Sequence, residues 1–140
     1  GSYFLQTKSV NYEVFILGSI IGFLCVGVLN LNNIRDIEND SKMNKKTIPT
    51  RIGFKNAKFY HYCLIISSLL LIIIFSTKFK ISNRLIFIIV GTLPISFHLF
   101  KVNQAKIPIE FKPLLKQLAI STFLYSIFMS IFLIYESIFF

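Results

Sequence analysis

The 140-residue chain is too apolar for an ordinary soluble domain: 54% of its residues are hydrophobic, mean hydropathy is +0.68 and only 15% are charged, against roughly 25% in soluble proteins. Its net charge of +9 would suit a nucleic-acid partner, but the basic residues lie in short connections between apolar runs. We therefore expect no nucleic-acid partner and favour an all-α membrane protein embedded in lipid.

Four apolar runs are long enough to cross a bilayer as helices. After a polar lead-in over residues 1–11, the first run is an uncharged stretch of 18 residues, which at about 1.5 Å per residue approaches the thickness of the hydrocarbon core. The sequence predicts one polytopic membrane helical bundle with four transmembrane helices, at about 14–31, 59–77, 85–100 and 118–135.

Several residues within these runs suggest how the helices pack. Gly18 and Gly22 form a small-residue face of the kind that lets membrane helices approach closely. We expect Pro94 to bend the third span, and residues 60–62 to lie at the membrane interface, where aromatic side chains gather. His98 is either functional at membrane depth or a hydrogen-bonded interior histidine, and we favour the second interpretation.

The basic residues predict an orientation. The two longer connections, 32–58 and 101–116, hold eleven of the fifteen Lys and Arg residues, and the other four lie on the opposite side. Because basic residues concentrate on the cytoplasmic side of membrane proteins, we expect the 32–58 loop to face the cytoplasm and both ends of the chain to face outward.

Three oxygen-bearing side chains follow the first span at helical spacing. Asn32, Asp36 and Asp40 fall at i, i+4 and i+8, so in a helix that continues through Asp40 they would stack on one face. Two acids four residues apart destabilise a helix slightly unless a cation lies between them. The spacing therefore predicts a metal site, and Mg²⁺ favours such oxygen ligands.

Cationic side chains follow this trio and suit phosphate oxygens. A membrane site that combines metal ligands with such cations fits a substrate with a charged head and a lipid tail, such as an isoprenyl diphosphate. The competing interpretation is an ordinary basic juxtamembrane loop, which does not explain the acids at Asp36, Glu38 and Asp40. The cationic residues and the threonine among them are Lys42, Lys45, Lys46, Thr47 and Arg51.

The stretch NNIRDIENDSKMNKKTIPTRIG, residues 32–53, resembles the second aspartate-rich motif of the UbiA superfamily of intramembrane prenyltransferases, in the branch that acts on 1,4-dihydroxy-2-naphthoate. The similarity extends over essentially the full chain, which would correspond to the C-terminal part, the last four helices, of a nine-helix prenyltransferase bundle. Pro49 departs from the family, which more often has Ala there. The matching positions are Asn32, Asn33, Arg35, Asp36, Asp40, Lys46, Thr47, Arg51 and Gly53.

The resemblance implies Mg²⁺-dependent transfer of a polyprenyl group from polyprenyl diphosphate to an aromatic acceptor, 1,4-dihydroxy-2-naphthoate, in menaquinone biosynthesis. It further implies a location in the bacterial inner membrane. Asn32, Asp36 and Asp40 would be the metal ligands, with the two aspartates as catalytic residues. By the same resemblance Arg35, Lys46 and Arg51 would bind the diphosphate.

The family also needs a first aspartate-rich motif, and no second acidic cluster occurs in these 140 residues. We therefore expect the chain to need an N-terminal half and to be inactive alone. Two alternatives remain open: a non-catalytic small membrane scaffold or subunit, and a related prenyltransferase for another aromatic acceptor.

Overall fold

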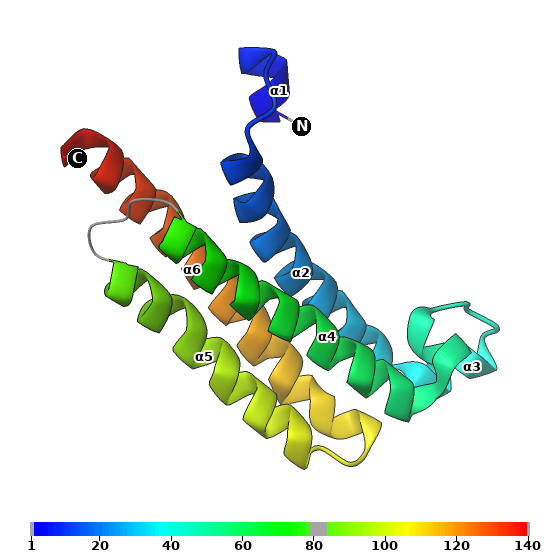
Figure 1. Cartoon of the computed structure of the whole chain (residues 1–140). Coiled ribbons are helices and arrows are strands. Elements are labelled where there is room, and N and C mark those ends of the chain that lie inside the picture. The colour runs from blue at the N-terminus through cyan, green and yellow to red at the C-terminus, as the bar shows by residue number, and fades with distance from the viewer. Residues whose placement is uncertain (1, 79–83, 140) are drawn as a thin grey trace.

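The computed structural model describes residues 2–78 and 84–139, and the regular structure in these ranges is entirely helical (Figure 1). Part of the predicted turn over 78–84, including Lys80, lies outside the described residues. The elements in chain order are α1 (Ser2–Thr7), α2 (Tyr12–Arg35), α3 (Ile37–Lys42), α4 (Ile48–Lys78), α5 (Arg84–Gln104), the 3-10 turn η1 (Pro108–Glu110) and α6 (Phe111–Phe139).

Four of these helices are long and apolar enough to cross a membrane, which confirms the predicted class and the number of spans in the described residues. Each helix extends past the apolar run that predicted it. The first, for example, begins at Tyr12 and ends at Arg35 rather than covering 14–31. Hydropathy marks only the part of a helix that suits lipid, whereas backbone hydrogen bonding continues the helix into polar residues at each end.

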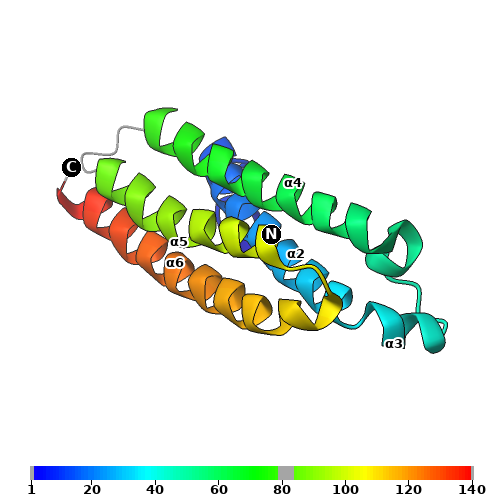
Figure 2. The same ribbon diagram turned by 90° about the horizontal axis from the view of Figure 1, so that it is seen from below.

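The long helices form a closed ring in which α2 contacts α4 and α6, and α5 contacts the same two helices. Figures 1 and 2 show α4, α5 and α6 lying side by side, with α3 outside the bundle at one end. Buried apolar side chains from all four long helices fill the interior. Examples are Leu24, Ile65, Phe87 and Leu118, which have 0% exposure.

Glycine packing differs from the sequence prediction. Gly18 and Gly22 are exposed, and a Cβ on either would meet no atom within 4 Å. The close approach occurs instead at buried Gly27, where a Cβ would lie 2.9 Å from Cδ1 of Ile65. The first buried residue of α2 is Ile20, and Figure 1 shows the start of this helix turned away from the rest of the bundle. The small-residue face therefore has no helix against it in the described part of the chain.

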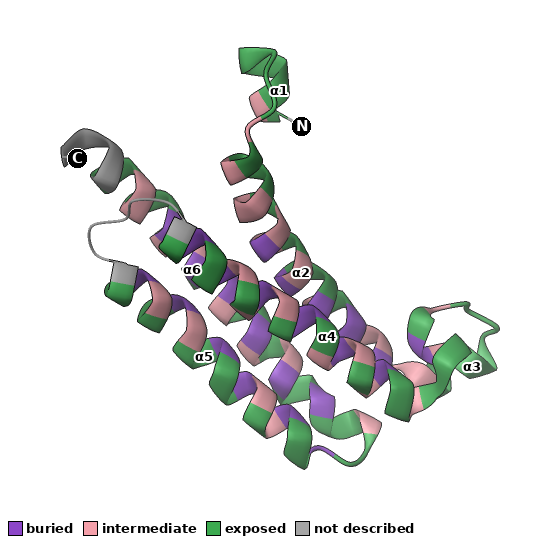
Figure 3. Cartoon of the chain, in the orientation of Figure 1, coloured by how far each residue is buried: buried purple, intermediate pink, exposed green. Residues whose placement is uncertain are grey.

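Pro94 and His61 differ in how they match the features predicted for the spans. Helix α5 runs through Pro94 without interruption. His61, which the sequence placed among interfacial aromatics, is instead fully buried in the bundle. Figure 3 shows exposed residues along the outward faces of the long helices, many of them large and apolar. Apolar outward faces suit helices surrounded by lipid.

One end of the bundle holds the connections between helices, and we call it the motif end. It comprises the α2 to α4 connection, residues 35–48, and the α5 to α6 connection, residues 104–111. The Lys58 side chain, from α4, links it to the α5 terminus because its Nζ donates to the carbonyl oxygens of Asn103 (3.0 Å) and Ala105 (2.8 Å). The eleven basic residues of the two predicted connections therefore lie at or near this end.

Candidate functional site

The helix carrying the acidic motif ends earlier than the sequence predicted. Helix α2 stops at Arg35, and Asp36 has φ −96° and ψ 9°, outside the helical region, before α3 begins at Ile37. Hydrogen bonds still cross the break, from the N–H of Asp36 to the Asn32 carbonyl (3.2 Å) and from the N–H of Asp40 to the Asp36 carbonyl (2.8 Å). The prediction of one continuous helix through Asp40 is therefore wrong, because the helix is interrupted at Asp36.

Three motif residues come together at the end of α2. The Arg35 guanidinium forms a bidentate pair with Asp36, donating from Nε to Oδ1 (2.7 Å) and from Nη2 to Oδ2 (2.6 Å). The same Nη2 donates to Oδ1 of Asn32 at 3.0 Å. A carboxylate oxygen and an amide oxygen therefore converge on a single positively charged nitrogen.

The Arg35 pair also changes the acidity of Asp36. Its hydrogen bonds, with a smaller contribution from its charge and that of Lys45, hold the pKa of the Asp36 carboxyl below its usual value. A carboxyl with a lowered folded-state pKa contributes stability above its unfolded pKa, and that contribution is lost as pH falls through the folded value. Asp36 is therefore ionised, and able to bind a cation, throughout the neutral range.

Asp40 lies one helical turn after Asp36 and has a different side-chain partner. The residue is buried, with 7% exposure, and its Oδ1 accepts from Nζ of Lys45 at 3.1 Å. Its other carboxylate oxygen, Oδ2, is buried with no hydrogen-bond partner in the described residues. A buried carboxylate oxygen without a donor is costly, so Asp40 keeps the capacity to accept one further cationic or hydrogen-bonding group.

The chain then turns back into α4. Thr47 and Thr50 hydrogen-bond reciprocally, backbone N–H to side-chain hydroxyl, at 2.8 and 3.4 Å. Pro49 is buried in the first turn of the helix, where a missing N–H costs nothing, so it begins the helix rather than breaking it. At Gly53 the helix is kinked, with φ 80° and ψ 163°.

A pocket of about 460 Å³ lies between the motif and η1. Arg35, Asp36 and Lys42 contribute charged groups on one side, and η1 with its flanking residue supplies an apolar wall. The predicted phosphate ligands Lys46 and Arg51 are exposed and do not line it. The full lining is Arg35, Asp36, Glu38, Asn39, Lys42, Ile107, Pro108 and Ile109.

The oxygen atoms at the end of α2 fit Mg²⁺ in part. The oxygens of Asn32 and Asp36 already converge on a cationic atom, and an ionised carboxylate with an amide oxygen is a donor set that this ion accepts. Among the described residues, however, no three His, Cys, Asp or Glu side chains are grouped to hold a metal. Asn32 and Asp36 therefore fit as partial ligands, and Asp40, one helical turn further along the chain, stays a predicted third ligand.

The sequence did not predict the 3-10 turn beside the pocket or the pairing of His98 with His61. The 3-10 turn forms a wall of the pocket, although the only local signal was Pro108 in a basic connection. His61 of α4 and His98 of α5 face each other with 3.1 Å between their Nε2 atoms, and both have 0% exposure. His98 is thus an interior hydrogen-bonded histidine, as the sequence favoured.

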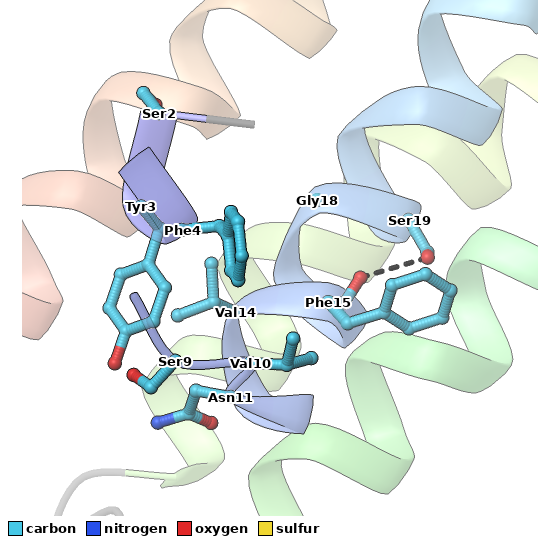
Figure 4. A pocket seen from close by; sticks show the side chains of 10 residues that line it. All are labelled: Ser2, Tyr3, Phe4, Ser9, Val10, Asn11, Val14, Phe15, Gly18 and Ser19. Carbon is cyan, nitrogen blue, oxygen red and sulfur yellow. Dashed lines mark hydrogen bonds between the residues drawn. The ribbon is translucent and has the colours of Figure 1, made fainter. Parts of the chain in front are cut away.

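A second pocket, of about 560 Å³, lies at the opposite end of α2. Figure 4 shows its walls, which come from α1, the following connection and the first turns of α2. Its lining contains no charged side chain. It therefore lacks the groups that would hold a diphosphate, and the pocket beside Asp36 is the better candidate.

Comparison with known proteins agrees with the resemblance at the motif. The family model for the UbiA prenyltransferase family matches residues 1–116. The 1,4-dihydroxy-2-naphthoate octaprenyltransferase of Haemophilus influenzae is 32% identical over 132 residues, covering 94% of this chain and 42% of the relative.

Two further relatives carry the same name. The Escherichia coli protein is 37% identical over 76 residues, covering 54% of this chain and 25% of the relative, and the Bacillus subtilis protein is 44% identical over 57 residues, covering 40% and 18%. The chain thus spans less than half the length of these curated relatives. No solved structure matches it. The match over residues 1–116 establishes that this chain belongs to the UbiA prenyltransferase family.

Proposed function

We propose that this chain forms the part of a membrane prenyltransferase that binds the diphosphate of a polyprenyl donor. The acceptor would be 1,4-dihydroxy-2-naphthoate, the compound in the names of the relatives. The observation that carries the proposal is the convergence of Asn32, Arg35 and Asp36 beside a pocket that also contains Lys42. These groups lie at the end of a membrane-length helix, where a lipid with a charged head would present its phosphates.

In this proposal the acidic and amide side chains hold the ion and the cationic ones hold the phosphates. Asn32, Asp36 and Asp40 would hold Mg²⁺, and the bound ion would neutralise charge that develops on the departing diphosphate. With Asp36 committed to an ion, the Arg35 guanidinium would be available to bind a phosphate oxygen in the pocket, which it already lines. Lys46 and Arg51 would reach the diphosphate from the exposed loop.

The distribution of basic residues indicates which side of the membrane the motif end faces. We propose that the motif end faces the cytoplasm of a bacterial inner membrane, because eleven of fifteen Lys and Arg residues belong to it and such residues concentrate on that side. A water-soluble aromatic acceptor would then approach from the cytoplasm, while the prenyl chain lies among the apolar helices. The remainder of the site would come from sequence that corresponds to the unmatched part of the relatives.

The test is reconstitution. The chain is co-expressed with the segment of the Haemophilus influenzae relative outside the matched region, and Mg²⁺-dependent octaprenylation of 1,4-dihydroxy-2-naphthoate is measured in membranes. We expect activity with the native chain and a loss of at least a hundredfold with Asp36→Asn, in line with the loss of a metal ligand or its support. Glu13→Gln, which removes an acid in the first turn of α2, at the other end of that helix and outside the pocket, is the matched control.

Two outcomes would reject the proposal. If Asp36→Asn is as active as Glu13→Gln and the native chain, Asp36 does not bind the metal. If the reconstituted pair is inactive while the intact relative is active under the same conditions, the chain is not a competent half of the enzyme, and a non-catalytic membrane subunit becomes the better interpretation.

A further inference from the structure

The connection between α5 and α6 carries positive charge that the proposed site does not use. Four lysines lie between residues 101 and 116, with a single acid, Glu110. The Glu110 carboxylate is already engaged, since its Oε2 accepts from the backbone N–H groups of Lys106 (2.6 Å) and Ile107 (3.3 Å). The lysines have no carboxylate partner among the described residues.

These lysines do not line the pocket beside Asp36. That pocket is lined in this region by Ile107, Pro108 and Ile109, and by no lysine of the α5 to α6 connection. Lys112 and Lys116 are both exposed and lie four residues apart on α6, so their ammonium groups share one helical face and repel each other unless an anion lies between them.

The depth of the lysines within the helices points to a partner. Lys101 lies three residues before the end of α5, and Lys116 lies five residues after the start of α6, which is at most about 8 Å from the helix ends at 1.5 Å per residue. The headgroup layer on each side of a bilayer is about 5–8 Å thick. With the ends of α5 and α6 taken as the outer edge of the headgroup layer, the lysines would lie at the depth of lipid phosphates.

Apolar side chains lie on the membrane side of these lysines. Phe97, Phe100 and Ile120 are each roughly half exposed, and Lys101 extends over the Phe97 ring with its Nζ 4.7 Å from the ring centroid. An ammonium group above exposed aromatic and aliphatic surface matches a lipid that has an anionic head and acyl chains.

We propose that Lys101, Lys112 and Lys116 form a docking surface for anionic phospholipid headgroups at the motif end. We call it the α5–α6 lysine surface. It is separate from the pocket beside Asp36, so it binds the phosphodiester of a membrane lipid rather than the diphosphate of a substrate. Its occupancy would fix the α5 to α6 connection, and with it the η1 wall of the pocket, against the membrane.

The experiment compares lipid binding by the full 140-residue chain in two variants that lose the same charge. The test variant is Lys112→Gln with Lys116→Gln. The control is Lys8→Gln with Lys55→Gln, two exposed lysines outside the surface. Purified protein in neutral detergent is titrated with phosphatidylglycerol or phosphatidylcholine, and bound lipid is counted by native mass spectrometry. Circular dichroism and gel filtration verify that both variants remain folded.

We expect the native chain and the control to retain phosphatidylglycerol over phosphatidylcholine. Each lysine near an anionic surface contributes about a five-fold preference at low ionic strength, so the test variant should lose roughly twenty-fold in selectivity. An equal loss of phosphatidylglycerol selectivity in both variants would overturn the proposed surface, because the selectivity would then depend only on the net charge of the chain. A third arm adds inorganic pyrophosphate at low ionic strength: displacement of the lipid would overturn the lipid assignment and indicate a phosphate site, whereas retention supports it.

Discussion

Two histidines meet at membrane depth between α4 and α5. Each ring is fully buried, the rings are tilted by 71° with centroids 5.3 Å apart, and their Nε2 atoms are 3.1 Å apart. Because one Nε2 must donate and the other accept, a neutral pair holds one proton between the two Nε2 atoms, and the accepting ring carries its own proton on Nδ1. Polar contacts of this kind fix the register of membrane helices, which the hydrophobic effect alone does not specify.

A double-mutant cycle measures this contact. Either single change, His61→Leu or His98→Leu, leaves the Nε2 of the remaining histidine without its partner in the interior. Each should destabilise the chain by about 1–3 kcal/mol. The double variant should cost less than the sum of the singles, with a coupling energy of about 1 kcal/mol. Unfolding free energies in detergent provide the measurement, and additive single effects would show that the histidines contribute no mutual stabilisation.

The residues of the site were predictable in kind and only partly in geometry. Spacing placed Asn32 and Asp36 on one face, and they do converge. Both side chains contact Arg35, which the family resemblance predicted to bind phosphate. Residue spacing does not predict where a long flexible side chain lies when no ligand is bound. The burial of Asp40 against Lys45 depends on the folded loop, and an i+4 count assumes an unbroken helix.

At the scale of elements, the backbone at Gly53 controls how the motif loop joins α4. Its φ of 80° with ψ of 163° lies in a region that is essentially restricted to glycine. The residue therefore allows the first turn of α4, which carries Arg51, to take a direction different from that of the rest of the helix. A side chain at this position would strain the loop that holds the candidate phosphate ligands.

We expect Gly53→Ala to lower the unfolding free energy by about 1–3 kcal/mol. Gly18→Ala is the matched control, because a Cβ there meets no atom within 4 Å and alanine in a helix is favoured over glycine by about 0.5–1 kcal/mol. The two variants should thus shift thermal unfolding in detergent in opposite directions. A shift of the same sign and size in both would mean that the Gly53 conformation is not maintained.

Sequence patterns predicted where the helices lie but not where they begin and end. Apolar runs located the four spans, but helix ends depend on caps such as Asn11, whose side chain accepts from the N–H of Glu13 at 2.8 Å. The positions of close helix packing were also not predicted from the sequence pattern. A small-residue pattern identified Gly18 and Gly22, whereas burial at Gly27 depends on which helices lie against α2, and that is a property of the assembled bundle.

On the scale of the whole molecule, the bundle separates charge from apolar surface. The motif end contains the candidate diphosphate site, which η1 helps to line, and the proposed α5–α6 lysine surface, whose residues do not line that site. The outward faces between the two ends expose large apolar residues such as Phe123 and Ile131. This division suits a protein that takes a lipid from the bilayer and acts on its charged head at the membrane surface.

Cysteine accessibility tests the resulting topology. Cys25 and Cys63 are free and exposed on spanning helices, so both are first replaced by Ser, and single cysteines are then introduced as Lys8→Cys and Lys46→Cys at opposite ends of the bundle. Because the motif end is the more basic one, we expect a membrane-impermeant maleimide to label only Lys8→Cys in intact bacterial cells. Both sites should react after permeabilisation, which controls for reactivity. Labelling of Lys46→Cys in intact cells would reverse the orientation and place the diphosphate site on the wrong side for a substrate delivered from the cytoplasm.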